Sequence, residues 1–201
     1  MKQYTIKKIT GAPNWANIPV ADMEIAYHEA KDIGIAGHAQ LCWDNDALYV
    51  HLWAKEEHIR NELTGQLEEV CQDSCLEFFF RPTESLHYFN FEFNPNCALW
   101  LGHGTGENLV RLVLMNQDKT LSPKANRTED GWEICYRVPF SFIQQFFPEF
   151  SPKEGLAFYG NFYKCGDNTQ YPHWFSWNDV TSDPLSFHRP QDFGRLILGG
   201  E

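Results

Sequence analysis

The stretch YFNFEFN, residues 88–94, alternates between aromatic and polar residues along most of its length. Successive side chains of a β-strand point to opposite faces, so its three phenylalanines share one face. Its two asparagines and its glutamate share the other face with Tyr88. The pattern predicts a strand that turns one face to an apolar core and carries a row of amides and a carboxylate on the other face.

The preceding stretch, CLEFFFR at residues 75–81, is separated from this strand by the turn sequence RPTES. The two strands are predicted to pair as an antiparallel hairpin, in which opposed residue numbers have a constant sum and a one-residue slip exchanges the faces. An even sum would bury Glu77 in the core without a partner, which is costly. We therefore predict an odd sum near 169, which places Glu77 opposite Glu92. The resulting polar strip contains Glu77, Arg81, Asn90, Glu92 and Asn94, beside Phe79 and Tyr88.

Turn residues divide the rest of the chain into further short strands, and aromatic residues, which favour strands, make up 15% of the sequence. Two segments favour helix: a turn around residues 56–62, and PFSFIQQFFP, which places Ile143, Phe146 and Phe147 on one stripe. We expect an all-β fold, a two-sheet antiparallel β-sandwich of immunoglobulin-like or jelly-roll-like type with one or two short helices, formed by residues 1–201 as a single domain. The expected strands are Gln3–Thr10, Ala39–Trp43, Ala47–Lys55, Cys75–Arg81, His87–Asn94, Cys97–Leu101, Leu109–Met115, Trp132–Val138, Gly155–Cys165 and Gly194–Leu198.

The net charge of −11 disfavours binding to nucleic acid or to an anionic membrane. The N-terminus lacks the apolar segment of a secretory signal, so we expect a cytoplasmic protein if Met1 is the native start, and a periplasmic or secreted one otherwise. The six cysteines are scattered, mostly in apolar runs, as expected of small buried hydrophobes. Cys71 and Cys75 lack a second Cys or His pair nearby, so they do not form a recognisable zinc motif.

The polar strip has two interpretations. It could be a solvated sheet face on which Arg81 pairs with a carboxylate, an arrangement that contributes little stability. Asn and Glu are poor strand formers, however, and their planar amides and carboxylates suit the recognition of sugar hydroxyls. Trp174 and Trp177 lie in a turn-rich segment before the last strand, where either ring could stack on a sugar or fill an end of the sandwich.

Six segments occur in an order that resembles the family 9 carbohydrate-binding modules, which are distantly similar to the DOMON-type sugar- and haem-binding domains. They are WDNDALYVHLWAKE, QDSCLEFFFRP, FNFEFNPN, GWEICYRVPFSFI, GNFYKCG and FSWNDVTSDPLSFHRPQDFGRLIL, between Ala39 and Leu198. The resemblance implies a β-sandwich that grips a sugar between two aromatic rings, while an acid, an arginine and amides bond to its hydroxyls. It also implies that structural calcium is possible; no other cofactor is expected, and the metal ligands are unknown.

By this resemblance Trp177 matches the C-terminal ring of the clamp and Glu77 matches the acid. Asn90 falls where the family has its arginine, a part that Arg81 could take instead. Val70 stands where the other ring is expected, so Trp53, Trp100 or Trp174 would have to supply it. The site predicted for this chain therefore consists of Trp177, Trp174, Glu77, Arg81, Asn90, Glu92 and Asn161.

The function expected is noncatalytic binding of a neutral sugar or glycan, associated with polysaccharide breakdown and with a glycan-degrading enzyme as a possible partner. One alternative is a glycoside hydrolase that uses Glu77 and Glu92, because retaining glycosidases hold two carboxyl groups about 5 Å apart. Another is a protein-interaction module whose exposed aromatic residues meet a partner. A narrow groove with convergent polar groups would favour a sugar, and a broad flat surface would favour a protein.

Overall fold

The computed structural model describes residues 1–28 and 33–201 of the chain, and the fold is an all-β sandwich as expected. Its strands are β1 (Gln3–Lys8), β2 (Ala21–Asp22), β3 (Ile25–Tyr27), β4 (Ala36–Trp43), β5 (Ala47–Lys55), β6 (Cys75–Arg81), β7 (Tyr88–Phe93), β8 (Leu99–Thr105), β9 (Asn108–Arg111), β10 (Lys124–Arg127), β11 (Gly131–Pro139), β12 (Ala157–Gly166), β13 (His173–Ser176) and β14 (Gly194–Leu198). The helices are α1 (Gln117–Thr120) and α2 (Phe140–Phe146), with short 3-10 turns at Trp15–Asn17, Val70–Gln72 and Pro190–Asp192. None of the described helices is long and apolar enough to cross a membrane.

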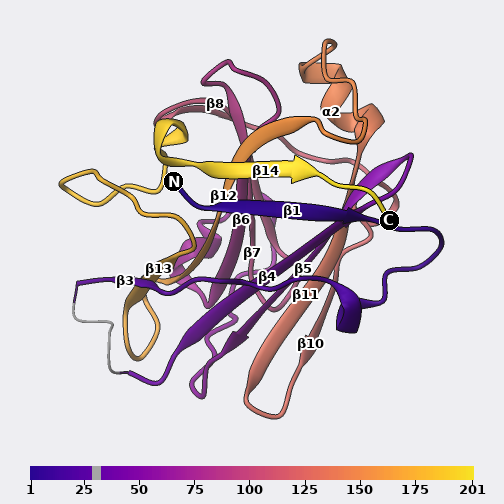
Figure 1. Ribbon diagram of the computed structural model, residues 1–201. Coiled ribbons are helices and arrows are strands. Elements are labelled where there is room, and N and C mark those ends of the chain that lie inside the picture. Colours follow the sequence, from indigo (N-terminus) through magenta and orange to yellow (C-terminus); the bar gives the residue numbers. More distant parts are fainter. Residues whose placement is uncertain (29–32) are drawn as a thin grey trace.

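The strands form two sheets that β1 joins (Figure 1). One sheet has the order β10-β11-β5-β4, with β2 added beside β4; the other has the order β14-β12-β6-β7-β8-β9, with β13 and β3 extending it beside β12. Residues 3–6 of β1 pair with β14 and residues 7–8 pair with β4, both in parallel. The sheets are antiparallel as predicted except at β1, which pairs in parallel with a strand of each sheet.

The register of the β6–β7 hairpin is the predicted one. Glu77 lies opposite Glu92, and Phe78 opposite Phe91. Of the two interpretations of the polar strip, the solvated sheet face was wrong, because every residue of both strands is buried. Side chains of the chain between β13 and β14, among them Val180 and Phe187, pack over Phe79 and Tyr163 and cover this outer face.

The apolar face of the same hairpin forms the core between the two sheets. Phe78 and Phe80 stack at a ring-centroid distance of 4.8 Å, and Phe91 stacks on Tyr136 of the facing sheet at 6.0 Å. Burial of each such ring contributes about 1.5–3 kcal/mol relative to exposure. The five core-facing phenylalanines of the hairpin thus anchor the sheet whose other face carries the polar residues.

Four short strands were not predicted: β2, β3, β10 and β13. They contain two to four residues each, too few for a two-residue period to stand out. The helical turn expected around residues 56–62 is absent from the structure. Instead the buried Glu56 carboxylate accepts hydrogen bonds from Ser74 and Trp132, which fixes this segment against the core. Helix α2 forms within the predicted stretch.

Candidate functional site

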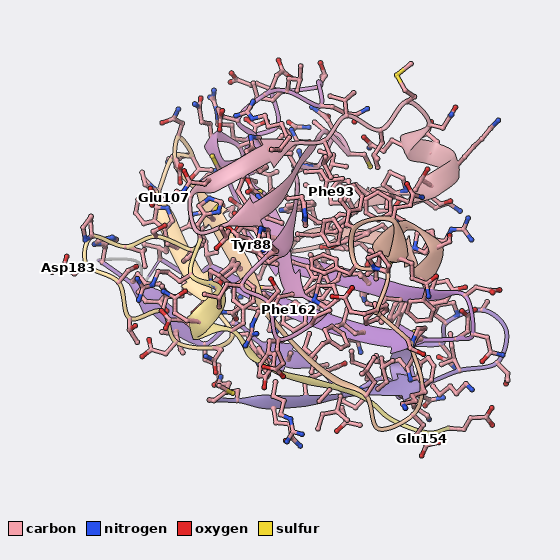
Figure 2. The ribbon with its side chains drawn as sticks, turned by 90° about the horizontal axis from the view of Figure 1, so that it is seen from above. Tyr88, Phe93, Glu107, Glu154, Phe162 and Asp183 are labelled. Carbon is pink, nitrogen blue, oxygen red and sulfur yellow. The ribbon has the colours of Figure 1, made fainter. Side chains whose placement is uncertain are left out.

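A pocket of about 520 Å³ opens on the outer face of the sheet that contains the β6–β7 hairpin. Its floor includes Glu77 of β6, Glu92 of β7 and Trp100 of β8, which follow one another across neighbouring strands. Trp174 of β13 and residues 183–188 form walls. Figure 2 shows Glu107 and Asp183, two further lining residues, on one side of the molecule, with Glu154 on the other. The volume lies within the range of small-molecule sites, about 300–1,000 Å³.

The two floor carboxyl groups are almost completely buried, Glu77 at 2% and Glu92 at 6% exposure. The Cys165 thiol donates to Glu77 Oε1 at 2.7 Å, and Asn90 Nδ2 donates to Glu92 Oε1 at 2.6 Å. Burial raises the pKa of both groups, and for Glu92 the neighbouring Glu77 raises it further. The pair therefore holds its protons more tightly than exposed glutamates do, and two of its four oxygens accept no hydrogen bond from the described residues.

Two tryptophans give the pocket its apolar surface. Trp174 is held by a hydrogen bond from its Nε1 to Asp167 Oδ1 at 2.8 Å, and the His28 ring meets it edge-on at 5.3 Å. The Arg111 guanidinium lies 4.8 Å from the centroid of the Trp100 ring. Trp100 Nε1 is buried without a partner. The partly exposed Trp174 ring offers a surface on which the C–H face of a sugar can stack.

The wall formed by the C-terminal segment is tied to the sheet. Phe187 stacks on Tyr163 at a centroid distance of 4.1 Å, and Tyr88 Oη lies 2.7 Å from His188 Nδ1. Burial lowers the pKa of His188, which keeps its ring neutral. The hydrogen bond between His188 and Tyr88 holds the C-terminal segment against β7. The pocket is thus walled by fixed side chains.

The structure separates the sequence-predicted residues into two groups. Glu77, Glu92 and Trp174 line the pocket, and the fully buried Asn90 supports Glu92. Trp177, by contrast, is only 4% exposed and packs in the core against Tyr4 and Phe162. Its ring contacts the α-carbon region of Gly194, where no larger residue would fit. The stacking role expected for Trp177 does not agree with this position, because no ligand reaches the ring.

Arg81 and Asn161 also lie away from the pocket. The Arg81 guanidinium stacks on Tyr159 at 3.9 Å and donates to the carbonyls of Thr83 and Glu84, so it does not orient Glu77 or Glu92. Asn161 bonds to the backbone of Phe162 and Asn178 and fixes the chain after β13. Asn94, expected in the strip, bonds instead to Asp73 and the carbonyl of Leu63.

Of the rings considered as a second clamp member, Trp100 and Trp174 line the pocket. Trp53 lies on the other sheet between the rings of His38 and His51. Val70 is buried beneath the pocket and packs in a cluster with Trp100 and Cys165. Sequence reasoning did not single out Asp167, which positions Trp174; its place in the turn directly after β12 was the available signal.

One group of potential metal ligands converges among the described residues: Cys75, Glu77 and Cys165, with ligand atoms within 4.8 Å of one another. Calcium takes six to eight oxygen ligands, so this set, with two thiols, does not fit calcium. Thiolates and a carboxylate are a donor set of the kind that zinc takes. The residues that the structure describes therefore give no support for the calcium site that the resemblance implied.

Comparisons with known proteins place this β-sandwich among the carbohydrate-binding modules. The sequence profile described as "Carbohydrate-binding family 9" matches residues 16–198. The structure is similar to that of a putative carbohydrate-binding protein from Bacteroides uniformis, with a TM-score of 0.81 and 24% identity over 100% of this chain and 99% of that one. No curated protein matches.

Two solved structures of a family 9 module from Caldicellulosiruptor kristjanssonii share the fold, each with a TM-score of 0.70 over 100% of this chain. The complex with cellotriose is 16% identical over 95% of that chain, and the complex with glucose is 14% identical over 97%. The chain belongs to carbohydrate-binding family 9, as the resemblance indicated. It is a noncatalytic carbohydrate-binding domain, which decides against the glycosidase alternative for Glu77 and Glu92.

Proposed function

We propose that the pocket binds one sugar unit, at the end of a glycan or free in solution. The observation that carries this proposal is the convergence of the Glu77 and Glu92 carboxyl groups with Trp174 and Trp100 around about 520 Å³ of space. A pyranose ring has apolar C–H faces and hydroxyls at its edge, and the pocket offers both kinds of partner. The concave shape supports a small ligand over the flat surface that a protein partner would use.

Each lining group has a role in this proposal. Trp174 stacks on the ring, because its indole is held by Asp167 and is only partly buried. Glu77 and Glu92 bond to hydroxyls through the oxygens that Cys165 and Asn90 leave free. Trp100 adds the apolar surface of its ring to the floor of the pocket. Glucose and cellotriose, the ligands of the similar Caldicellulosiruptor module, are the first ligands to test.

The test is calorimetric titration with glucose, cellobiose, cellotriose and xylobiose. We expect binding by the wild type, and loss of at least about tenfold in affinity in Trp174→Ala, which corresponds to roughly 1.4 kcal/mol. Trp53→Ala is the matched control, because Trp53 is also partly buried but lies on the other sheet. Equal losses in the two variants, or wild-type affinity in Trp174→Ala, would contradict the proposed site.

A further inference from the structure

The lining of the pocket is rich in carboxyl groups and poor in basic groups. Its lining includes six carboxyl groups, on Glu69, Glu77, Glu92, Glu107, Asp167 and Asp183. Within residues 1–28 and 33–201, no lysine or arginine lines it. The bases in the lining are His28 and His188, and His188 is kept neutral by burial. A ligand that enters therefore meets several carboxyl groups and no lysine or arginine in the described lining, and Arg111, which lies against the lining Trp100, is already paired with Glu69.

Three of the four outer acids have partners among the described residues. Glu69 is paired with Arg111, Asp167 accepts from Trp174 Nε1, and Glu107 accepts from Ser186 Oγ at 3.1 Å. The inner pair is different, since among the described residues Glu77 accepts from the Cys165 thiol and Glu92 from the Asn90 amide. The buried Lys164 forms no ion pair with them: its Nζ lies 3.1 Å from Glu56 and 2.7 Å from His173.

Two opposed carboxyl groups with little solvent are an unfavourable arrangement unless a proton or a cation joins them. Directly opposed residues of an antiparallel pair have Cβ atoms about 4.5–5.5 Å apart, so a single small cation can reach both carboxylates. An ammonium group has three donors and no acceptor, which matches two carboxylates that each have a free oxygen. Trp174 and Trp100 also line the pocket, so a sugar ring that lies against them is beside the two carboxylates.

Resting on the proposed function of the pocket, we propose that its preferred ligand is an amino sugar, a hexosamine with a free, protonated amine that lies between Glu77 and Glu92. The ring stacks on Trp174 and the remaining hydroxyls bond to the outer polar groups. Sugars that carry a carboxylate or sulfate are rejected, because they add a negative charge to a pocket that already holds six carboxyl groups.

The test uses three sugars that differ at one substituent: glucose, glucosamine and N-acetylglucosamine, each titrated calorimetrically at a pH where the free amine is protonated. We expect glucosamine to bind at least about tenfold more tightly than glucose and than N-acetylglucosamine. In Glu92→Gln and in Glu77→Gln, which keep the shape and the bonds from Asn90 and Cys165, the ratio of glucosamine to glucose affinity falls toward one. Glu154→Gln, an exposed site outside the pocket, makes the same charge change and keeps the wild-type ratio.

The outcomes separate this inference from the function on which it rests. If glucose binds as tightly as glucosamine to the wild type, the amine preference is overturned and the sugar-binding pocket stands. Equal affinity for N-acetylglucosamine and glucosamine also overturns it, because the charge is then irrelevant. An unchanged ratio in both floor variants, shown to be folded by thermal unfolding, removes the assigned position of the amine. If no sugar of any kind binds to folded wild type, the proposed function itself fails.

Discussion

Glu77 and Glu92 lie directly opposite each other on adjacent strands, and both are more than nine-tenths buried. Like charges at this spacing repel, and burial disfavours their ionised forms. The sheet can carry this pair because five phenylalanines on its other face bury it in the core and because the pair opens onto a pocket. The free energy of unfolding should therefore depend on whether these two carboxyl groups are ionised, and so on pH.

Replacement of Glu77 by Gln is expected to stabilise the protein at alkaline pH. Burial raises the pKa of Glu77 to about 7, while Asp167 raises it and Cys165 and Lys164 lower it. The folded state then binds protons more tightly than the unfolded state, whose glutamate has a pKa of about 4.3. The unfolding free energy of the wild type therefore falls as pH rises from about 4.3 to 7. Above pH 7 we expect Glu77→Gln to be more stable by on the order of 1–3 kcal/mol.

Urea unfolding of both proteins between pH 4.5 and 8.5 measures this difference. The difference should be near zero at the acid end, where the wild-type carboxyl is protonated as well. Glu154→Gln serves as the control for a change of net charge, because Glu154 is exposed. Parallel stability curves for wild type and Glu77→Gln at all pH values would contradict the raised pKa.

Trp177 and Trp174 are three residues apart in sequence, but truncation of Trp177 should mainly reduce stability, whereas truncation of Trp174 should mainly reduce sugar binding. Trp177 packs in the core, so we expect Trp177→Ala to lower the unfolding free energy by about 3–5 kcal/mol. Trp174 is partly exposed, so Trp174→Ala should cost less stability and remove sugar binding. Denaturant unfolding and calorimetric titration of both variants distinguish the two roles. A larger stability loss in Trp174→Ala would mean that the roles are reversed.

A buried ion pair lies on the inner face of the same sheet. Lys164 Nζ is 3.1 Å from Glu56 Oε2, and both side chains are at most 1% exposed. Lys164→Met leaves the Glu56 carboxylate uncompensated, so we expect a loss of about 3–5 kcal/mol in unfolding free energy, measured with urea. The double variant Lys164→Met, Glu56→Gln removes both charges and should recover part of that loss. No recovery in the double variant would show that the pair acts through packing and not through charge.

The hairpin register was predictable because the alternating phenylalanines permit one parity, and it placed Glu77 and Glu92 together correctly. The exchange of roles between Trp174 and Trp177 was not predictable, because both lie in or beside a short strand without a clear period. The position of Arg81 depends on Tyr159, a residue 78 positions later that only the folded β6–β12 pair brings beside it. Burial of the polar strip likewise required knowledge of where the C-terminal segment crosses the sheet.

Gly102 provides the last prediction, because its position decides where two pocket groups lie. It sits opposite Asn90 on the neighbouring strand, and a Cβ atom there would collide with Asn90 Oδ1 and with the ring of Trp100. Gly102→Ala should therefore displace the Trp100 ring and the Asn90 amide that bonds to Glu92. Overpacking of this kind costs about 1–3 kcal/mol.

We expect sugar affinity in Gly102→Ala to fall by about tenfold or more while the protein stays folded. Gly200→Ala is the matched control, because a Cβ atom there meets only the flexible end of Glu154, at 3.0 Å. Titration and thermal unfolding of both variants give the comparison. Unchanged affinity in a destabilised Gly102→Ala would show that the ligand does not contact Trp100, and it would move the stacking surface entirely to Trp174 and the wall that contains Phe187.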